Sequence, residues 1–414
     1  MLIDNPNFKA IPSTNKREES FVGIRIKDNF IEFHYPETYN LSVDDKNLRK
    51  DIINILRTVS LAKTKKDTYS EYYTEHHNIA SFPLSAYLWI INDYLTFGRY
   101  ENKETSYNVG INGKVSWKRT MMSEPIISHG NVVYTTIVSE TNKQQDNLLT
   151  EIYNFCVKKS VDSVGWLYSI GFDTNGIDYY RRFNKRLYLN AVNMTLTHTF
   201  NDNKKIRLQQ MKNIITGLDD CLKNTNELNY GVESYEYVYE CMIDRLFSNI
   251  SDIREFYPKA SWYLIKDHQH CDTAPLRPDT ILIRDRDVYI LDSKYYRYGV
   301  TFDPNDLPDT TSIQKQITYG DYVSKAKKGQ YNTVFNAFLL PYSRINNKSK
   351  IFSDNIEFVG FANAEWSFGK THSNIAAILI DMNFLVNNWV QKNRSITDKL
   401  TDMIEINVRS CLNG

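Results

Sequence analysis

Hydrophobic residues recur at two spacings along the chain, and the dominant spacing changes near residue 146. Apolar and polar residues alternate through 20–35, which predicts a short β-hairpin. Apolar residues recur every three or four positions through 46–63 and 84–97, which predicts two helices, and 131–139 is strand-like. The first 145 residues therefore predict a β-rich, mixed α/β domain.

Helical spacing dominates after residue 146, and strand patterns return after residue 256. A helix is expected from Leu148, and 179–247 has the spacing of three or four helices. Further on we expect strands at 260–265, 279–284, 288–295, 356–361 and 375–381, and helices at 312–328 and 382–391. The pattern predicts an α+β or α/β multidomain protein, with a β-rich domain at 1–145, a helical connecting region at 146–225 and a mixed sheet flanked by helices at 226–414.

Composition is typical of a globular protein, with 42% hydrophobic and 24% charged residues among 414. No run of about 18 apolar residues is present and the N-terminus has no apolar signal core, so we expect neither a membrane span nor export. The five cysteines have no paired spacing, which favours reduced thiols in the cytoplasm. Because the net charge is only +1, any nucleic-acid surface must be a local patch.

The stretch RPDTILIRDRDVYILDSKYYR, 277–297, contains two apolar strand patterns with charges at their ends. If Asp285-Arg286 is a two-residue loop, Asp279 faces Asp292 across the ladder, and Lys294 points to the same side of the sheet as Asp292. Like charges placed opposite each other destabilise a sheet, and a divalent cation would offset that cost. The alternative is that these are solvated turn charges.

Carboxylate pairs of this kind suit Mg²⁺, which prefers oxygen ligands and often takes one or two carboxylates together with phosphate oxygens. We expect Mg²⁺ as the cofactor, with Mn²⁺ able to substitute. A lysine beside such carboxylates can position or deprotonate an attacking water, or offset charge that builds on phosphorus. These groups are the ones needed to hydrolyse a phosphodiester.

Pro278-Asp279 followed by Asp292-Ser293-Lys294 after an apolar strand resembles the PD-(D/E)xK nuclease signature. The resemblance implies a restriction-endonuclease-like fold for 226–414, with Asp279, Asp292 and Lys294 as catalytic residues. The family usually adds a glutamate from a preceding helix, and Tyr239-Glu240 in SYEYVYECMIDRLF resembles its aromatic–glutamate pair. Glu240 is therefore the expected third metal ligand, although helical-wheel placement keeps Glu236 open.

Two further segments resemble particular nucleases. SIQKQITYGDYV, 312–323, resembles the helix that follows the motif in McrC and RecB-type nucleases, which implies that Gln316 and Tyr319 hold the substrate backbone or position the catalytic groups. An ordinary amphipathic helix is the alternative. NGKVSWKRT (112–120), the helix at 148–167 and the nuclease block together are similar to LlaJI-type, McrC-like restriction endonuclease subunits.

This wider resemblance implies that the N-terminal region contacts a McrB-like AAA+ GTPase oligomer, which supplies recognition and translocation of double-stranded DNA. The chain has no G-x-x-x-x-G-K-[ST] pattern, so we expect it to bind no GTP itself. An Asn112-Gly113 hairpin would present Arg119 near its tip, where a cation can stabilise charge on a transferring phosphoryl group. In the alternative, Val115 and Trp117 pack in a β core and the basic residues form its solvated edge.

The leading hypothesis is a Mg²⁺-dependent DNA endonuclease subunit of a phage-defence restriction system. A self-sufficient type II restriction endonuclease and a non-catalytic adaptor with a nuclease-like fold are the alternatives. The segment DHQHCD, 267–272, groups histidines, a cysteine and aspartates, but no second element supplies further ligands at zinc spacing, so we expect a polar loop.

Overall fold

The computed structural model describes residues 6–14, 20–27, 30–61, 83–100, 102–145, 148–168, 182–222, 227–266, 268–347, 351–367 and 369–413. The chain divides into two compact units, one formed by Met1–Ala80 with Asn226–Gly414 and the other by Ser81–Thr225. The predicted boundary near 225 falls at a junction between the units, and the one near 145 falls inside the second unit. The expected mixture of helices and several sheets is confirmed.

A five-stranded mixed sheet forms the centre of the first unit, with the strand order β12-β13-β14-β16-β15. Its strands are β12 (Thr280–Arg284), β13 (Asp287–Ser293), β14 (Val334–Tyr342), β15 (Ile356–Ala362) and β16 (Ile375–Asp381). The strands β13, β14 and β16 run parallel, and the edge strands β12 and β15 are antiparallel to their neighbours. Every residue of β14 is buried, as expected for a central parallel strand covered on both faces.

The register predicted for the β12–β13 hairpin is confirmed. Thr280 pairs with Leu291 and Arg284 with Asp287, which leaves Asp285-Arg286 as the loop. Both loop residues have positive φ, 49° and 70°, as a type I′ turn requires, although neither is a glycine. The Arg286 guanidinium donates to the carbonyl of Gly329 at 2.9 Å, a contact that holds the turn in place.

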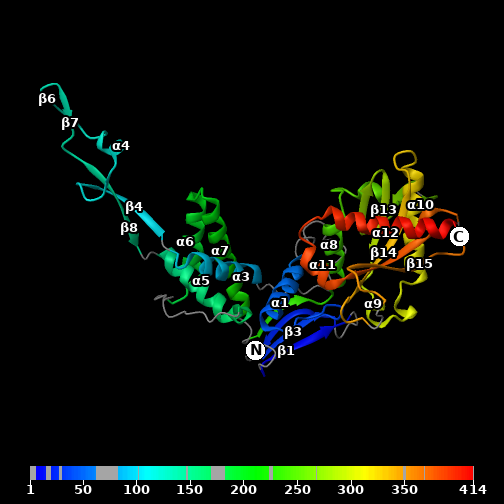
Figure 1. The fold of residues 1–414 in the computed structure, drawn as a ribbon. Coiled ribbons are helices and arrows are strands. Elements are labelled where there is room, and N and C mark those ends of the chain that lie inside the picture. The colour runs from blue at the N-terminus through cyan, green and yellow to red at the C-terminus, as the bar shows by residue number, and fades with distance from the viewer. Residues whose placement is uncertain are drawn as a thin grey trace. The chain divides into compact units, whose positions relative to one another are not determined.

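Helices cover both faces of this sheet (Figure 1). On one face, Tyr319 and Val323 of α10 (Thr310–Ala326) pack against Ile281 and Ile290. On the other face, α12 (Arg394–Asn413) supplies Glu405, whose carboxylate accepts a hydrogen bond from Tyr289 and pairs with Arg284. Because side chains alternate along a strand, Asp292 and Lys294 lie on the face that α10 covers.

The N-terminal segment is part of the same unit. Its strands are β1 (Phe8–Ser13), β2 (Val22–Lys27) and β3 (Phe30–Pro36), which join β9 (Glu227–Val232) in a four-stranded sheet. Helix α1 (Asp45–Val59) buries Leu48, Ile52 and Leu56, and its Thr58 hydroxyl lies 2.6 Å from that of Tyr235, just before α8 (Glu236–Phe247). The small helices α9 (Tyr298–Thr301) and α11 (Met382–Asn388) complete the unit.

The second unit has a helical part and a β insertion. Its helices are α3 (Leu84–Phe97), α5 (Leu148–Val164), α6 (Lys185–His198) and α7 (Asp202–Leu222). A buried carboxylate ties three of them together, since Asp93 accepts hydrogen bonds from Tyr153 at 2.8 Å and from Arg207 at 2.7 and 2.8 Å. Among the residues placed by the structure, no helix is long and apolar enough to span a bilayer.

The insertion between α3 and α5 begins and ends with two paired strands, β4 (Asn102–Val109) and β8 (Val138–Gln145). Between them lie β5 (Lys114–Val115), α4 (Trp117–Thr120), β6 (Ile126–Ser128) and β7 (Asn131–Val133). We refer to 107–138 as the tip of the insertion. Because Asn102 pairs with Gln145, the ends of the insertion are adjacent.

Several sequence predictions are wrong in detail. Asn112-Gly113 is not the turn of a hairpin, because β4 and β5 both pair with β8 and not with each other. The expected strand at 131–139 is broken between β7 and β8, and 179–247 contains β9 as well as helices. Within the expected polar loop at 267–272, Asp267 lies outside the described residues, and Gln269–Asp272 form the strand β11, paired with β10 (Ser261–Leu264).

The division into units makes a prediction about deletions. Replacing 102–145 with a short Gly-Ser linker should leave the first unit folded, because the insertion begins and ends at one ladder pair; the melting temperature should shift by less than about 3 °C. Deleting residues 1–61 should instead abolish cooperative melting, because it removes β2 from β9 and the buried face of α1. Calorimetry of both variants tests this, and a folded 1–61 deletion would contradict it.

Candidate active site

Asp279, Asp292 and Lys294 come together at the C-terminal end of β13, and we refer to this part of the central sheet as its carboxylate edge. Continuing the confirmed register by one pair places Asp279 opposite Asp292. The Ser293 backbone N–H donates to Asp279 Oδ2 at 2.9 Å, and Lys294 Nζ lies 2.7 Å from Asp292 Oδ2. The Lys294 backbone N–H also donates to the Leu339 carbonyl of β14 at 2.9 Å, so the lysine is held by the sheet itself.

The electrostatics of this edge reflect the crowding of acidic groups. Burial raises the pKa of Asp279 well above its usual range, and repulsion from Asp292 and Glu240 adds to the increase. The Ser293 N–H and the Lys294 ammonium act in the opposite direction. Burial disfavours the charge of Lys294, but attraction to Asp292 and Asp279 outweighs it and raises the pKa of the lysine. Lys294 is therefore an ammonium at neutral pH.

The two candidate glutamates occupy different environments on α8. Glu240 is half-buried and close enough to Asp279 to raise the pKa of that carboxyl, whereas Glu236 is exposed in the first turn. Across the described ranges, however, no group of three or more His, Cys, Asp or Glu side chains is arranged to hold a metal ion. The role of Glu240 as a ligand stays a prediction, and its position agrees better with that role than the position of Glu236 does.

One carboxylate oxygen fits a cation particularly well. Asp292 is 2% exposed, and its Oδ1 is buried without a hydrogen-bond partner among the residues that the structure describes. A buried carboxylate oxygen without a donor costs free energy of folding. Its neighbour Asp279 supplies further oxygen atoms of the kind that hard divalent cations prefer. The donor set therefore fits Mg²⁺, which Asp279 and Asp292 would hold.

Gln316 and Tyr319 of α10 are buried, at 1% and 0% exposure, so their position favours supporting the site over touching substrate. Gln316 Nε2 donates to the carbonyl of Ile290 on β13 at 2.8 Å. The Tyr319 hydroxyl donates to the carbonyl of Arg277 at 2.7 Å, two residues before Asp279. These bonds tie α10 to β13 and to the segment just before β12 that carries Asp279.

Sequence reasoning missed a contact that joins the N-terminal segment to this edge. Arg297, three residues after Lys294, donates to both carboxylate oxygens of Glu37, at 3.0 and 2.8 Å. Both side chains are about a quarter exposed, and a bidentate pair of this geometry fixes orientation as well as charge. Nothing local in the sequence marks Glu37, because its partner lies 260 positions away.

Arg119, the predicted partner-facing residue, lies on the helix α4 in the tip of the insertion. It is exposed, and its guanidinium stacks 3.8 Å from the centre of the Tyr107 ring. Trp117 is 62% exposed, so the alternative that it packs in a β core is wrong. Other exposed apolar residues of the tip are Val109, Ile111, Met121, Met122, Ile126, Ile127, Val132 and Val133.

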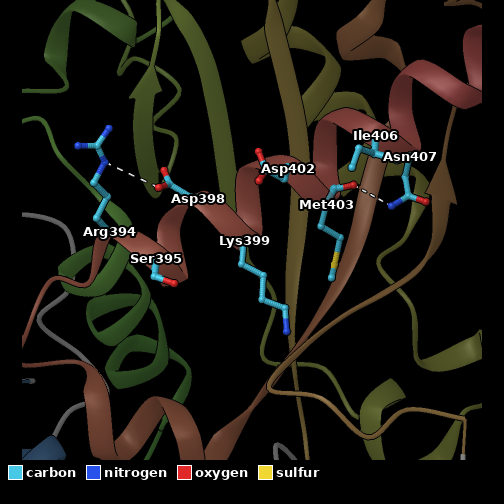
Figure 2. Close-up of a pocket in the computed structure, with 8 residues that line it drawn as sticks. All are labelled: Arg394, Ser395, Asp398, Lys399, Asp402, Met403, Ile406 and Asn407. Carbon is cyan, nitrogen blue, oxygen red and sulfur yellow. Dashed lines mark hydrogen bonds and ion pairs between the residues drawn. The ribbon is translucent and has the colours of Figure 1, made fainter.

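A surface hollow of about 830 Å³ lies along α12, and the residues that line it are drawn in Figure 2. All of its lining residues belong to that helix, which packs against the sheet face opposite the carboxylates. Its side chains also bond along the helix, as in the Arg394–Asp398 pair and the bond from Asn407 to the Met403 carbonyl. We therefore assign it no role in the chemistry of Asp279 and Asp292.

The raised pKa of Asp279 predicts a pH-dependent stability. Because the folded carboxyl holds its proton above the unfolded value of 3.8, wild-type stability should fall as pH rises through the folded pKa. The Asp279→Asn side chain does not ionise, so the variant does not lose stability in this way. Without divalent cation its melting temperature should therefore exceed that of wild type at pH 7, and the difference in melting temperature should vanish below about pH 4. Asp285→Asn, at the exposed far end of the hairpin, is the control. A gain independent of pH would contradict the assignment.

One solved structure is similar to the chain over most of its length. It is described as a refined half-complex from a tetradecameric assembly of Thermococcus gammatolerans McrB AAA+ hexamers with bound McrC. The sequence identity is 12%, the match covers 93% of this chain and 83% of that chain, and the TM-score is 0.41. Among curated proteins, none matches.

A family profile described as the LlaJI restriction endonuclease matches residues 21–384. The matched range contains α8, the hairpin with Asp279 and Asp292, Lys294 and the whole β4–β8 insertion. The resemblance seen in the sequence is confirmed, and the chain belongs to the LlaJI restriction endonuclease family.

Proposed function

We propose that this chain is the Mg²⁺-dependent DNA endonuclease subunit of a phage-defence restriction system, and that it hydrolyses phosphodiester bonds of double-stranded DNA together with a McrB-like AAA+ GTPase. The observation that carries the proposal is the set of Asp279, Asp292 and Lys294 at one sheet edge, with the Asp292 Oδ1 atom buried and without a described hydrogen-bond donor. Membership of a restriction endonuclease family supports nuclease activity. The strand context supports a nuclease domain of the PD-(D/E)xK kind.

Asp279 and Asp292 would hold the cation, with Glu240 as the further carboxylate of the site. When bound, Mg²⁺ lowers the pKa of a water molecule and neutralises phosphate oxygens. The β12–β13 register fixes the two aspartates opposite each other, and the bond from Ser293 N–H fixes the orientation of Asp279. The geometry for binding is therefore set by the hairpin before substrate arrives.

Lys294 acts through its charge in this proposal. Its ammonium lies on the same face as Asp292, and its surroundings raise its pKa, which opposes a role as a proton acceptor. An ammonium at this position orients the attacking water and stabilises negative charge as it builds on the phosphoryl oxygens. Gln316 and Tyr319 hold the strands that carry these groups.

The tip of the insertion is the surface that we propose for the GTPase partner. Its many exposed apolar residues form a surface of the kind that marks protein–protein contacts. Arg119, Lys114 and Lys118 place exposed cations among them. A self-sufficient type II enzyme has no need of such a surface, and a non-catalytic adaptor has no need of the Asp279, Asp292 and Lys294 set, so both features favour a catalytic subunit.

Substitutions at Asp292 and Lys294 should separate metal binding from catalysis. Asp292→Ala should lose both DNA cleavage and Mn²⁺ affinity, because it removes a ligand. Lys294→Ala should lose cleavage by at least about a hundredfold yet bind Mn²⁺ within a few-fold of wild type, because the ammonium stabilises charge and does not ligate. Calorimetric titration with Mn²⁺ and a plasmid cleavage assay measure the two effects. Cleavage at the wild-type rate by Asp292→Ala would refute the site.

Arg119→Ala should reduce the stimulation of GTP hydrolysis by the partner without changing Mn²⁺ binding at the nuclease site. A contribution from outside the nucleotide site should be about tenfold or less, well below the ~10³–10⁵ of a true arginine finger. Lys392→Ala, an exposed lysine outside the insertion, is the control, and Arg119→Lys tests whether charge alone suffices. Excision of 102–145 should abolish stimulation. Full stimulation by the excised chain would show that the partner docks elsewhere.

A further inference from the structure

The β10–β11 hairpin projects from the chain immediately before the proposed catalytic residues. Residues 261–266 and 268–270 are all exposed, and so are Leu276 and Arg277 at its base. Its base is closed by a bond from the Leu276 N–H to the Pro258 carbonyl at 3.0 Å. Asp279 follows Arg277 by two residues, at most about 7 Å along the chain. The hairpin is thus rooted beside the carboxylates.

Large apolar and aromatic side chains are exposed on both faces of this hairpin. Trp262 is 66% exposed, Tyr263 58%, Leu264 42% and Ile265 81%. The register pairs Trp262 with Cys271 and Tyr263 with His270, so Trp262 and Tyr263 point to opposite faces. A two-stranded hairpin has no core of its own, so these side chains gain little from folding alone.

The two faces of the hairpin differ in their chemistry. Ser261, His270 and Asp272 share the face of Tyr263, whereas Trp262, Leu264 and Cys271 share the other face with Gln269. A protein partner or a second copy would cover the apolar Trp262 face and leave the polar Tyr263 face in water. A duplex groove is different, because a two-stranded ribbon inside it meets a groove wall on each side.

The chemistry of the hairpin fits DNA. Aromatic residues stand among groups that can bond phosphates and base edges: the Tyr263 hydroxyl lies 3.0 Å from His268 Nδ1, and the Tyr263 and His270 rings are 5.9 Å apart. The sequence 259–277 carries Lys259, Lys266 and Arg277 against Asp267 and Asp272, a net charge of +1. This modest excess predicts a contact that depends more on ring packing and base edges than on phosphates.

We propose that the β10–β11 hairpin enters the major groove of duplex DNA and holds the duplex over Asp279 and Asp292. This proposal rests on the nuclease function proposed above. The tip lies on the order of 20 Å from the base of the hairpin at ordinary strand rise, which suits a groove about 12 Å wide and 8.5 Å deep. Trp262 and Tyr263 contact the two walls, and Lys266 at the turn contacts phosphate.

The test compares Trp262→Ala with Trp366→Ala, and Lys266→Ala with Lys392→Ala. Each control residue is exposed and lies outside the hairpin. Trp366 is 64% exposed and follows β15, whose end pairs with the start of β16, away from the carboxylates. Lys392 is likewise exposed. Binding of a short fluorescent duplex is measured by anisotropy with Ca²⁺ in place of Mg²⁺, and cleavage is measured with Mg²⁺ over a range of DNA concentrations.

Trp262→Ala should weaken duplex binding about tenfold and raise KM by a similar factor, with kcat at saturating DNA within about threefold of the parent. Lys266→Ala should lower the slope of log K against log salt by about one. Trp366→Ala should leave the duplex affinity and KM unchanged, and Lys392→Ala should leave the salt slope unchanged. In a second measurement, duplex DNA should protect the parent from acrylamide quenching, and Trp262→Phe should lose that protection while Trp366→Phe keeps it.

The outcomes separate the two proposals. If the parent cleaves DNA and the hairpin variants bind it as tightly as the parent, the hairpin proposal fails and the nuclease proposal stands. If Trp262→Ala changes self-association or partner binding but not DNA affinity, the surface is a protein contact and the hairpin proposal is wrong. If the parent neither binds nor cleaves duplex DNA with its GTPase partner present, the proposed function fails and the hairpin proposal fails with it.

Discussion

The repulsion between Asp279 and Asp292 is the constraint around which the first unit is organised. The β12–β13 register sets the two carboxyl groups opposite each other, and a one-residue slip would turn every side chain of the strand to the other face. The protein tolerates the cost through the Ser293 N–H and the Lys294 ammonium, and part of it remains as the raised pKa of Asp279. In the proposed function, this loss of stability is the cost of a preformed cation site.

Holding two like charges together requires a rigid frame, and the structure supplies it from several distant segments. Gln316 and Tyr319 bond α10 to the backbone on both sides of the hairpin. Arg286 anchors the turn at the far end, and Glu37 clamps Arg297 just beyond Lys294. The N-terminal sheet therefore belongs to the same compact unit as the proposed catalytic residues, and the surface that we propose for a partner lies in the tip of the insertion.

The sequence was sufficient to predict the hairpin, its register and the residues at its ends, because two apolar runs separated by the charged residues Asp285 and Arg286 are a local signal. It was insufficient for β14, whose apolar run is consistent with a buried strand but contains Pro341, a residue that argues against a central strand. Pro341 is tolerated because the pairing with β13 ends at Leu339. The Asn112-Gly113 hairpin was predicted wrongly because β4 and β5 each pair with β8, which lies later in the sequence, and the Glu37–Arg297 pair had no local signal.

Locating a bound ion tests the central claim most directly. A crystal of the protein soaked in Mn²⁺ should show one anomalous peak at the end of β13, about 2.0–2.3 Å from carboxylate oxygens of both Asp279 and Asp292. The Asp292 Oδ1 atom, which has no described hydrogen-bond donor, should be one of those ligands. A strong peak elsewhere, or a fully soaked crystal with no peak beside these two aspartates, would contradict the account.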